Sequence, residues 1–280
     1  MNENISIITA SDISDSVAEA YFKEEQSGVS TGWHNIDRHY TVMTGQFTVV
    51  TGVPSHGKSE FIDALCVNLA MKHSWRILMF SPENYPITTH IKKLIKKYIG
   101  KPYGKMYNGT MDTTEANNAI HFINETFLFI DPGEYLITVD DLIEIAKRED
   151  VDGFVIDPWN ELDHRRPNGM NETEYISLSL GKLRTAARAN NIHIWLVAHP
   201  KKPDAGRSYK NSPPNLYDVA GSAHWYNKAD NGITVHRPDV VDGSETHIHI
   251  TKVRFRNIGK PTGEEPIQLE YSMASGRYSE

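Results

Sequence analysis

Cysteine is nearly absent from this sequence, which has one, Cys66, among 280 residues. One cysteine excludes a disulfide framework and the zinc modules that need several thiolates. Cys66 stands in an apolar stretch with helical spacing, so we interpret it as a small core residue rather than a nucleophile or a metal ligand.

Long apolar runs and a basic excess are also missing. The hydrophobic share is 39%, and no run approaches the length of about 20 residues that crosses a bilayer. The first residues show no basic region followed by an apolar stretch. The net charge of −7 argues against a uniformly basic, nucleic-acid-coating surface. We therefore expect a soluble intracellular protein without membrane association.

The most informative feature that is present is the segment 52–59, which fits G-x-x-x-x-G-K-[ST]. An apolar, β-branched stretch precedes it and a helical pattern follows it, which is the setting in which backbone N–H groups can cradle phosphate oxygens. Lys58 would reach the β- and γ-phosphates, and the Ser59 hydroxyl would ligate Mg²⁺. The alternative is a glycine-rich turn without a ligand. The residues expected to contact a nucleoside triphosphate such as ATP are Gly52, Val53, Pro54, Ser55, His56, Gly57, Lys58, Ser59 and Glu60.

Strand and helix patterns alternate from about residue 31, which predicts one α/β domain with a mostly parallel sheet covered by helices on both faces. Three further strands near the C-terminus, with short turns and no helix between them, predict an antiparallel extension on one edge. The strands are expected at 47–51, 76–81, 126–130, 153–157 and 192–198, then at 233–236, 247–255 and 267–271, and the helices near 59–72, 87–99, 114–125, 138–149 and 172–191.

The polar, acidic segment 1–30 is expected to form an arm outside the domain at 31–280. A short helix capped by Ser11 would place Ile13, Val17 and Tyr21 on one face. The sequence leaves open whether this face docks on a neighbouring subunit or folds back on its own domain.

Three predicted strands end in side chains that suit phosphate chemistry, and ligands of such sheets bind beyond the carboxyl ends of the strands. Asp157 follows an apolar strand, as a Walker B acid does, and would hold Mg²⁺ opposite Ser59. Glu83 could orient or deprotonate the attacking water, or be a surface glutamate in a turn. His199 could sense the γ-phosphate or be a polar boundary residue.

Two basic features stand apart from the phosphate loop. The stretch from His199 to Asn215 carries four cations against Asp204, a charge of 4 − 1 = +3, and its composition predicts a mobile loop. Strand alternation would place Lys252, Arg254 and Arg256 on one face. Such a row could supply an arginine to a neighbour's nucleotide, or could simply discourage strand pairing at a sheet edge.

Taken together, these motifs resemble the helicase domain of the DnaB type, most closely the ring helicases of phage primase–helicases and Twinkle. The similarity runs through TVVTGVPSHGKSEFIDAL, MFSPEN, GFVIDPWNEL, IWLVAHPKKP, DVAGSAHWYNKADNGI and KVRF, over about nine tenths of the chain. It implies a RecA-like fold, ATP with Mg²⁺, a ring that is expected to be hexameric, and travel on single-stranded DNA with unwinding of duplex. The partners it implies include a primase or another replisome protein, and the expected location is the cytoplasm of a bacterial or phage-infected cell.

Residue by residue, the resemblance implies Glu83 as catalytic base, Asp157 as Walker B acid, His199 as γ-phosphate sensor, and Lys252 and Arg254 as a K-x-R pair that acts on the adjoining subunit, with Arg256 as competitor. No primase part is expected, so the sequence is interpreted as a helicase domain alone or as a stand-alone phage-like version. The alternative function is a RecA- or KaiC-like ATPase that controls assembly without unwinding. The cations implied to contact DNA are Arg165, Arg166, Lys201, Lys202, Arg207 and Lys210.

Overall fold

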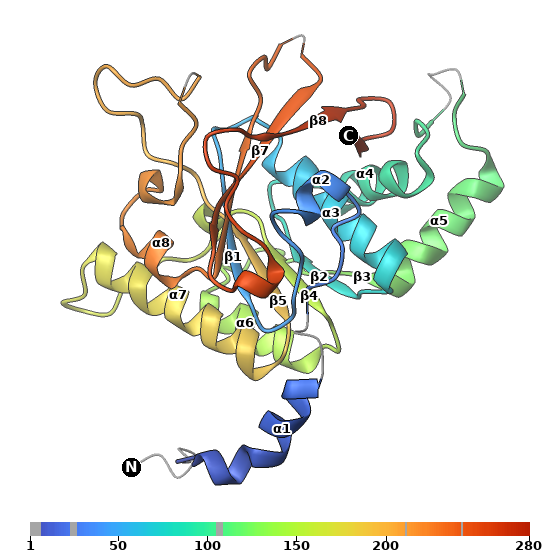
Figure 1. The fold of residues 1–280 in the computed structure, drawn as a ribbon. Coiled ribbons are helices and arrows are strands. Elements are labelled where there is room, and N and C mark those ends of the chain that lie inside the picture. The colour runs from blue at the N-terminus through green and yellow to red at the C-terminus, as the bar shows by residue number, and fades with distance from the viewer. Residues whose placement is uncertain (1–6, 23–26, 105–108, 211, 242) are drawn as a thin grey trace.

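One continuous β-sheet forms the centre of the computed structural model, which describes residues 7–22, 27–104, 109–210, 212–241 and 243–280 (Figure 1). Across the sheet the strands are β3 (Phe127–Phe129), β2 (Ile77–Phe80), β4 (Gly153–Ile156), β5 (His193–Val197), β1 (Phe47–Thr51), β6 (Asn231–His236), β7 (Glu245–Val253), β8 (Ile267–Tyr271) and β9 (Tyr278–Ser279).

The sheet from β3 to β6 is parallel, and β7, β8 and β9 extend it in antiparallel fashion. This confirms the mostly parallel α/β fold expected from the sequence. One detail was wrong, because β6 runs parallel to β1 and only its other edge pairs in antiparallel fashion, with β7. The segment between β5 and β6 is long enough to return the chain to the other end of the sheet, as a parallel pair requires.

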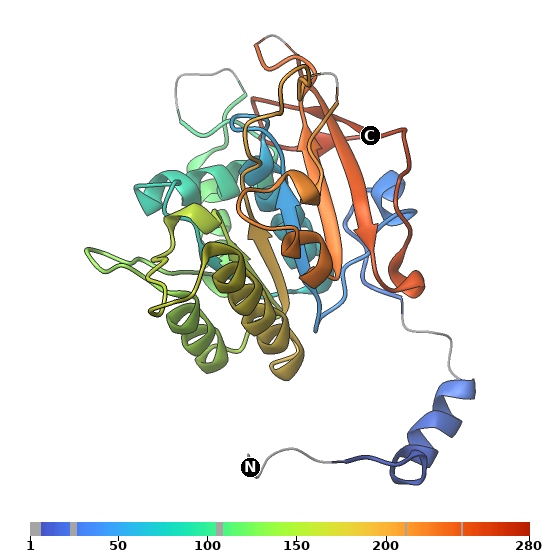
Figure 2. The ribbon, with the colours of Figure 1, turned by 90° about the vertical axis from the view of Figure 1, so that its left-hand side faces the viewer.

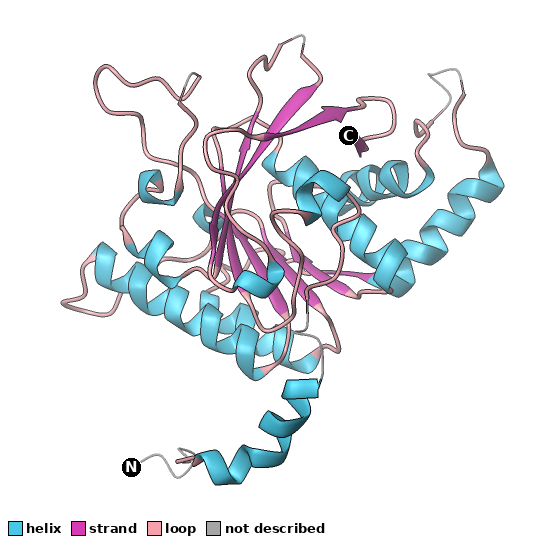
Figure 3. Cartoon of the chain, viewed as in Figure 1, coloured by secondary structure: helices cyan, strands magenta, loops and turns pink. Residues whose placement is uncertain are grey.

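Helices cover both faces of the sheet (Figures 2 and 3). One face packs against α3 (Lys58–His73), α4 (Ile87–Ile99) and α5 (Thr113–Thr126), and the other against α6 (Val139–Arg148), α7 (Glu172–Ala189) and α8 (His224–Lys228). Because both faces are covered, the central strands read as continuous apolar runs. The short elements are α2 (His34–Asp37) and the 3-10 turns η2 (Trp159–Glu161), η3 (Leu216–Asp218) and η4 (Arg256–Ile258).

Reciprocal capping fixes the first turn of several helices. The Asp112 side chain accepts from the backbone of Glu115 at 2.8 Å, while the Glu115 side chain accepts from the backbone of Asp112 at 3.0 Å. The same box recurs at Thr138 with Asp141 and at Asn171 with Glu174. Each box satisfies N–H groups that the first helical turn leaves without partners.

The N-terminal arm consists of η1 (Ala10–Ile13) and α1 (Ser14–Phe22), and both ribbon views show it apart from the body of the domain (Figures 1 and 2). Ser11 is not the cap, because it lies within η1, whose N-cap is Thr9 in a capping box with Asp12. Ile13, Val17 and Tyr21 are 45%, 58% and 85% exposed, so this apolar face is uncovered. In the described ranges no helix is both long and apolar enough to cross a membrane.

A buried polar group ties the segment before β1 to the sheet. His193 on β5 contacts the Met43 carbonyl oxygen at 2.7 Å through Nδ1 and the Thr48 hydroxyl at 2.8 Å through Nε2. Its ring is fully buried, and burial lowers the pKa of His193 to about 4. The imidazole is therefore neutral in the folded protein at pH 7.

Acidification should destabilise the protein partly through His193. Between about pH 6.5 and pH 4 the unfolded state binds a proton that folded His193 does not, so stability falls as pH falls, by at most about 1.4 kcal/mol per pH unit for this group. Urea unfolding of the protein and of His193→Gln across this range measures the slope. The variant should show the shallower slope, and equal slopes would contradict this role for His193.

Candidate nucleotide-binding site

The phosphate loop follows β1 directly, and its backbone has a shape that glycine makes possible. Gly52 has φ +148°, and a Cβ there would lie 2.2 Å from the Val235 carbonyl oxygen, so a larger residue would force β6 away. Gly57 has φ +88° and is the N-cap of α3. The loop therefore curls tightly before α3 and leaves the N–H groups of the first helical turn open to an anion.

Lys58 lies inside this curl. Its Nζ donates to the carbonyl oxygens of Gly52 at 2.9 Å and Val53 at 3.1 Å. Burial lowers the pKa of Lys58 to about 8, against the opposing effect of the Asp157 and Glu83 carboxylates. The ammonium remains charged at pH 7 and can interact with phosphate oxygens that enter the loop.

The residues expected to hold Mg²⁺ are adjacent. Ser59 lies in the first turn of α3, near the Asp157 carboxylate, which follows β4 and is 3% exposed. Burial raises the pKa of Asp157 to about 6, and the nearby carboxylates of Asp63 and Glu83 add to the effect. A buried carboxylate beside a hydroxyl, with further acids nearby, fits a hard divalent cation. Across the described residues, no three His, Cys, Asp or Glu side chains could hold a metal, so such an ion would also need ligands from the substrate.

Glu83 lies in the turn after β2, and hydrogen bonds to its neighbours fix this turn. Asn84 Nδ2 donates to the Ser81 hydroxyl at 2.8 Å, and Lys93 Nζ donates to Asn84 Oδ1 at 2.8 Å. Ser81 in turn lies 3.5 Å from Asp157 Oδ2. The Glu83 side chain is half exposed, with Oε1 3.9 Å from His199 Nε2. The structure thus brings Glu83, His199, Lys58 and Asp157 to one edge of the sheet.

His199 follows β5 and stands at the base of the basic loop. Its Nδ1 is buried without a hydrogen-bond partner in the described chain, and burial together with the Lys58 charge lowers the pKa of its imidazole. The loop closes beside it, where the Lys201 N–H donates to the Asp218 carbonyl oxygen at 2.7 Å. His199 therefore adjoins the base of the basic loop.

The sequence analysis missed two residues beside the phosphate loop, Arg237 and His236, both of which lie close to the predicted residue His56. The Arg237 N–H donates to His56 Nδ1 at 3.1 Å, and the Arg237 Cδ atom lies 3.8 Å from where a Cβ on Gly57 would be. The His56 ring lies 5.1 Å from that of His236. Burial lowers the pKa of His56 to about 4, so its imidazole is neutral. Only the pairing of β6 with β1 brings these residues together, and no local pattern indicates that pairing.

Glu60, included among the nucleotide contacts, has a side chain directed elsewhere. Its carboxylate pairs with Lys97 and, at 3.0 Å, with Lys93, and it accepts a hydrogen bond from Tyr271 at 3.1 Å. Although burial opposes the effect, the two ammonium groups lower the pKa of Glu60 to about 2. The Glu60 side chain therefore joins α3 to α4 and β8, which leaves only its backbone facing the loop.

Three of the cations expected to contact DNA are engaged within the chain. Arg207 pairs with Asp218 through two nitrogens, at 2.6 and 2.9 Å, and its guanidinium lies 5.1 Å from the Tyr209 ring. Lys201 pairs with Asp204 at 3.2 Å, and Arg165 with Asp163 at 2.5 Å. The charge of +3 expected for the loop falls to 4 − 2 = +2 when Asp218, which lies just outside the stretch counted, is included. The remaining three, all exposed, are Arg166, Lys202 and Lys210.

The C-terminal basic row breaks after its second member. Strand β7 ends at Val253, and Arg256 begins η4, so the prediction that strand alternation places Arg256 on the face of Lys252 and Arg254 was wrong. Lys252 Nζ donates to the Tyr226 carbonyl oxygen and lies 4.5 Å from the Tyr226 ring, and burial lowers its pKa to about 8. Arg254 pairs with Asp230 at 2.9 Å. The two side chains thus share one face toward α8.

The fold and loop define a RecA-like phosphate-loop ATPase domain. More specifically, this chain belongs to the DnaB-like helicase C terminal domain family, whose pattern matches residues 28–275. It is 38% identical over 278 residues to the "Twinkle homolog protein, chloroplastic/mitochondrial" of Arabidopsis thaliana, an alignment that covers 94% of this chain and 38% of that protein. The chain therefore spans well under half the length of this curated relative.

Solved structures agree with this fold at low sequence identity. The ATPase domain of a phage protein superposes with a TM-score of 0.79 at 18% identity, covering 98% of this chain and 99% of that one. A DnaB-like replicative helicase, solved in a study of its interactions with primase, gives 0.77 at 18% identity, covering 94% and 66%. The RadB recombinase gives 0.55 at 16%, covering 88% and 97%.

The resemblance to DnaB-type helicases is therefore confirmed. The expectation of a cytoplasmic protein of a bacterial or phage-infected cell is contradicted, because the curated relative named above is a chloroplastic/mitochondrial protein. The absence of a recognisable leader in these residues was the basis of that expectation, and it was a poor guide.

Proposed function

We propose that this domain is an NTP-driven replicative DNA helicase that works as a ring, expected to contain six protomers, and travels along single-stranded DNA. The observation that carries the proposal is the position of Arg254. Asp230, its ion-pair partner, accepts a hydrogen bond from the first residue of β1, whereas the phosphate loop follows the last. At about 3.3 Å per residue, the ends of this strand are roughly 13 Å apart, so Arg254 is poorly placed for its own nucleotide and suits a neighbour's.

The residues at the carboxyl edge of the sheet have different roles in the proposed hydrolysis. Lys58 and the N–H groups of the loop neutralise charge on the transferring phosphoryl group, and Glu83 orients and deprotonates the attacking water. Ser59 and Asp157 would hold Mg²⁺, which supplies Lewis-acid stabilisation of the phosphate oxygens when bound. Arg254 of the adjoining protomer completes the cluster of positive groups.

His199 is proposed to connect hydrolysis with movement on DNA. It faces Glu83 at 3.9 Å and adjoins the loop closed by Lys201 and Asp218. Loss of the γ-phosphate would release the imidazole and alter the loop base. Contacts of Arg166, Lys202 and Lys210 with DNA phosphates would then change with the nucleotide state and would be sensitive to salt.

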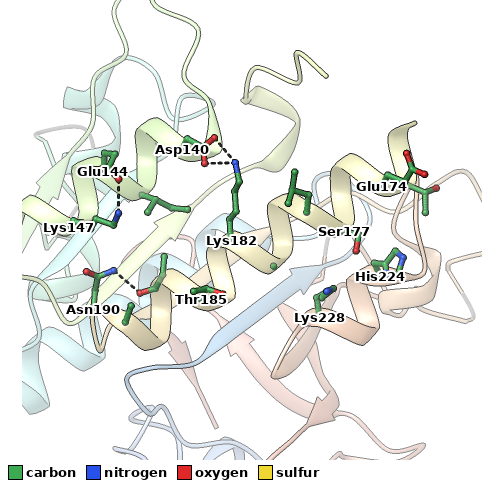
Figure 4. A pocket seen from close by; sticks show the side chains of 16 residues that line it. Asp140, Glu144, Lys147, Glu174, Ser177, Lys182, Thr185, Asn190, His224 and Lys228 are labelled. Carbon is green, nitrogen blue, oxygen red and sulfur yellow. Dashed lines mark hydrogen bonds and ion pairs between the residues drawn. The ribbon is translucent and has the colours of Figure 1, made fainter. Parts of the chain in front are cut away.

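Ring assembly is proposed to use the arm at 1–30, docked on the neighbouring protomer's domain. A groove of about 880 Å³ runs along α6, α7 and α8 (Figure 4). Its apolar lining includes Ile143, Leu178 and Ala189, and Gly181 leaves a gap in the surface of α7. Leu178 is 44% exposed, so contact between the groove and the uncovered face of α1 would remove apolar surface of both from water.

Placing a charge on the apolar face of α1 should weaken ring assembly without unfolding the domain. Val17→Asp is expected to shift the protein toward smaller species in sedimentation with ATP, by roughly tenfold in the concentration needed for assembly, since burying an unpaired carboxylate is unfavourable. Asp15→Asn, on the opposite face of the helix, is the control. Equal assembly of both variants would remove α1 from the interface.

Strand displacement on a forked DNA substrate tests the proposed function directly. Displacement should require hydrolysable nucleotide and should be absent with a non-hydrolysable analogue. ATP hydrolysis stimulated by DNA, with no strand displaced on any fork, would instead favour the alternative of a RecA-like ATPase that controls assembly.

A further inference from the structure

Asp230 is a carboxylate that the fold holds rigidly. It precedes β6 and is fully buried. Its N–H donates to the Phe47 carbonyl oxygen at 2.8 Å, and its Oδ2 accepts from the Phe47 N–H at 3.3 Å. Both ends of the residue are therefore fixed to the first residue of β1.

The other carboxylate oxygen, Oδ1, meets three guanidinium groups. Arg254 Nε and Arg184 Nη2 each lie 2.9 Å away, and Arg188 Nη2 lies 3.5 Å away. A buried carboxylate needs a cationic partner, and α7 already supplies one in Arg184. Neutralising Asp230 therefore does not by itself explain why Arg254 is also held there.

The guanidinium of Arg254 is held along one edge. While Nε pairs with Asp230, Nη2 donates to the carbonyl oxygens of Asn227 at 3.1 Å and Ala229 at 3.2 Å. Its own N–H donates to the Asp230 carbonyl oxygen at 2.9 Å. Within the described residues Nη1 has no hydrogen-bond partner, and the side chain is 32% exposed. One donor end thus points away from the contacts that restrain the group.

We propose that Asp230 is a positioning residue for Arg254, and that it presents the Nη1 end to the phosphates of the adjoining protomer's nucleotide. The inference rests on the proposed function, in which Arg254 acts across the subunit junction. A long arginine side chain on a surface samples many rotamers, and fixing one of them costs conformational entropy. Because Asp230 already fixes the orientation of Arg254, this cost is not added to the activation free energy of hydrolysis. Asp230 never touches the nucleotide and acts only through Arg254.

The test is Asp230→Asn, which keeps the side-chain shape and removes the charge. ATPase measured on assembled protein with single-stranded DNA should show kcat reduced at least about tenfold, with KM for ATP within about twofold. The double variant Asp230→Asn/Arg254→Ala should be no slower than Arg254→Ala alone, because the two changes remove one function. The matched control is Arg184→Gln, which removes another cation from the same carboxylate and should keep kcat within about twofold of the parent.

The outcomes separate this inference from the proposed function. Asp230→Asn with parental kcat beside an inactive Arg254→Ala would overturn the positioning role and leave the cross-subunit arginine intact. Full activity of Arg254→Ala would instead remove the proposed function. Equal losses in Asp230→Asn and Arg184→Gln would show that the ion cluster only holds α7 to the sheet.

A second variant covers the case in which Asp230→Asn does not fold. Arg254→Lys keeps the charge and leaves Asp230 paired, but one nitrogen cannot both hold Asp230 and reach the neighbour. It should be as slow as Arg254→Ala in kcat. Parental activity of Arg254→Lys would contradict the positioning role.

Discussion

Replacing Glu83 with glutamine should lower ATP turnover by roughly 10²- to 10⁴-fold while leaving nucleotide binding almost unchanged. Glutamine keeps the size of the side chain but cannot accept the proton of the attacking water. The turn that carries it is fixed through Asn84 and Lys93, so the substitution should leave the backbone in place. Phosphate release and the binding of a fluorescent nucleotide measure the two effects separately.

Glu161 offers a matched control for this experiment. It is an exposed acid whose charge raises the pKa of His199, but it lies in η2 rather than in the turn after β2. Glu161→Gln should therefore retain turnover within about threefold. If Glu83→Gln hydrolyses ATP at the parental rate, the assignment of Glu83 as base is wrong and the attacking water is activated elsewhere.

Removing Arg254 should be comparably severe but should act on the neighbour. Arg254→Ala is expected to lower turnover of the assembled protein on the order of a thousandfold, the scale of arginine fingers in phosphoryl transfer, with nucleotide still bound at each phosphate loop. Added to the parent protein, the variant should suppress the activity of its partners in proportion to its share of the ring. Phosphate release at constant total protein measures this.

Arg256→Ala is the control, because Arg256 belongs to η4 and not to the strand face of Lys252 and Arg254. It should neither lose activity nor poison mixed assemblies. If Arg256→Ala suppresses its partners while Arg254→Ala does not, the two roles are exchanged. If neither does, catalysis is completed within one protomer.

Local patterns were enough to predict the parts of the fold and site that depend on contiguous residues. The loop from Gly52 to Ser59 and the apolar strand before Asp157 can be read directly, since strand, turn and helix signals follow one another in the chain. The capping boxes add fixed starting points for helices. The parallel pairing of β6 with β1 was not predicted, because a long connection separates β6 from the preceding strand, β5.

Contacts between distant residues could not be predicted, and they determine what each cation can do. Arg207 looked free because the acid that binds it, Asp218, lies beyond the stretch used for the charge count. Arg254, Arg184 and Asp230 come from three separate elements, and no spacing relates them. The same holds for Arg237 beside His56, which requires β6 to lie against β1.

The central claim is that each hydrolytic centre is built from two protomers, and the most direct measurement mixes two inactive variants. Glu83→Gln protomers carry Arg254 but no base, and Arg254→Ala protomers carry the base but no arginine. In an equal mixture allowed to reassemble, roughly a quarter of the junctions combine both intact parts. Single-turnover hydrolysis should then recover about that fraction of the parental amplitude. A mixture as inactive as its two components would contradict a centre shared between protomers.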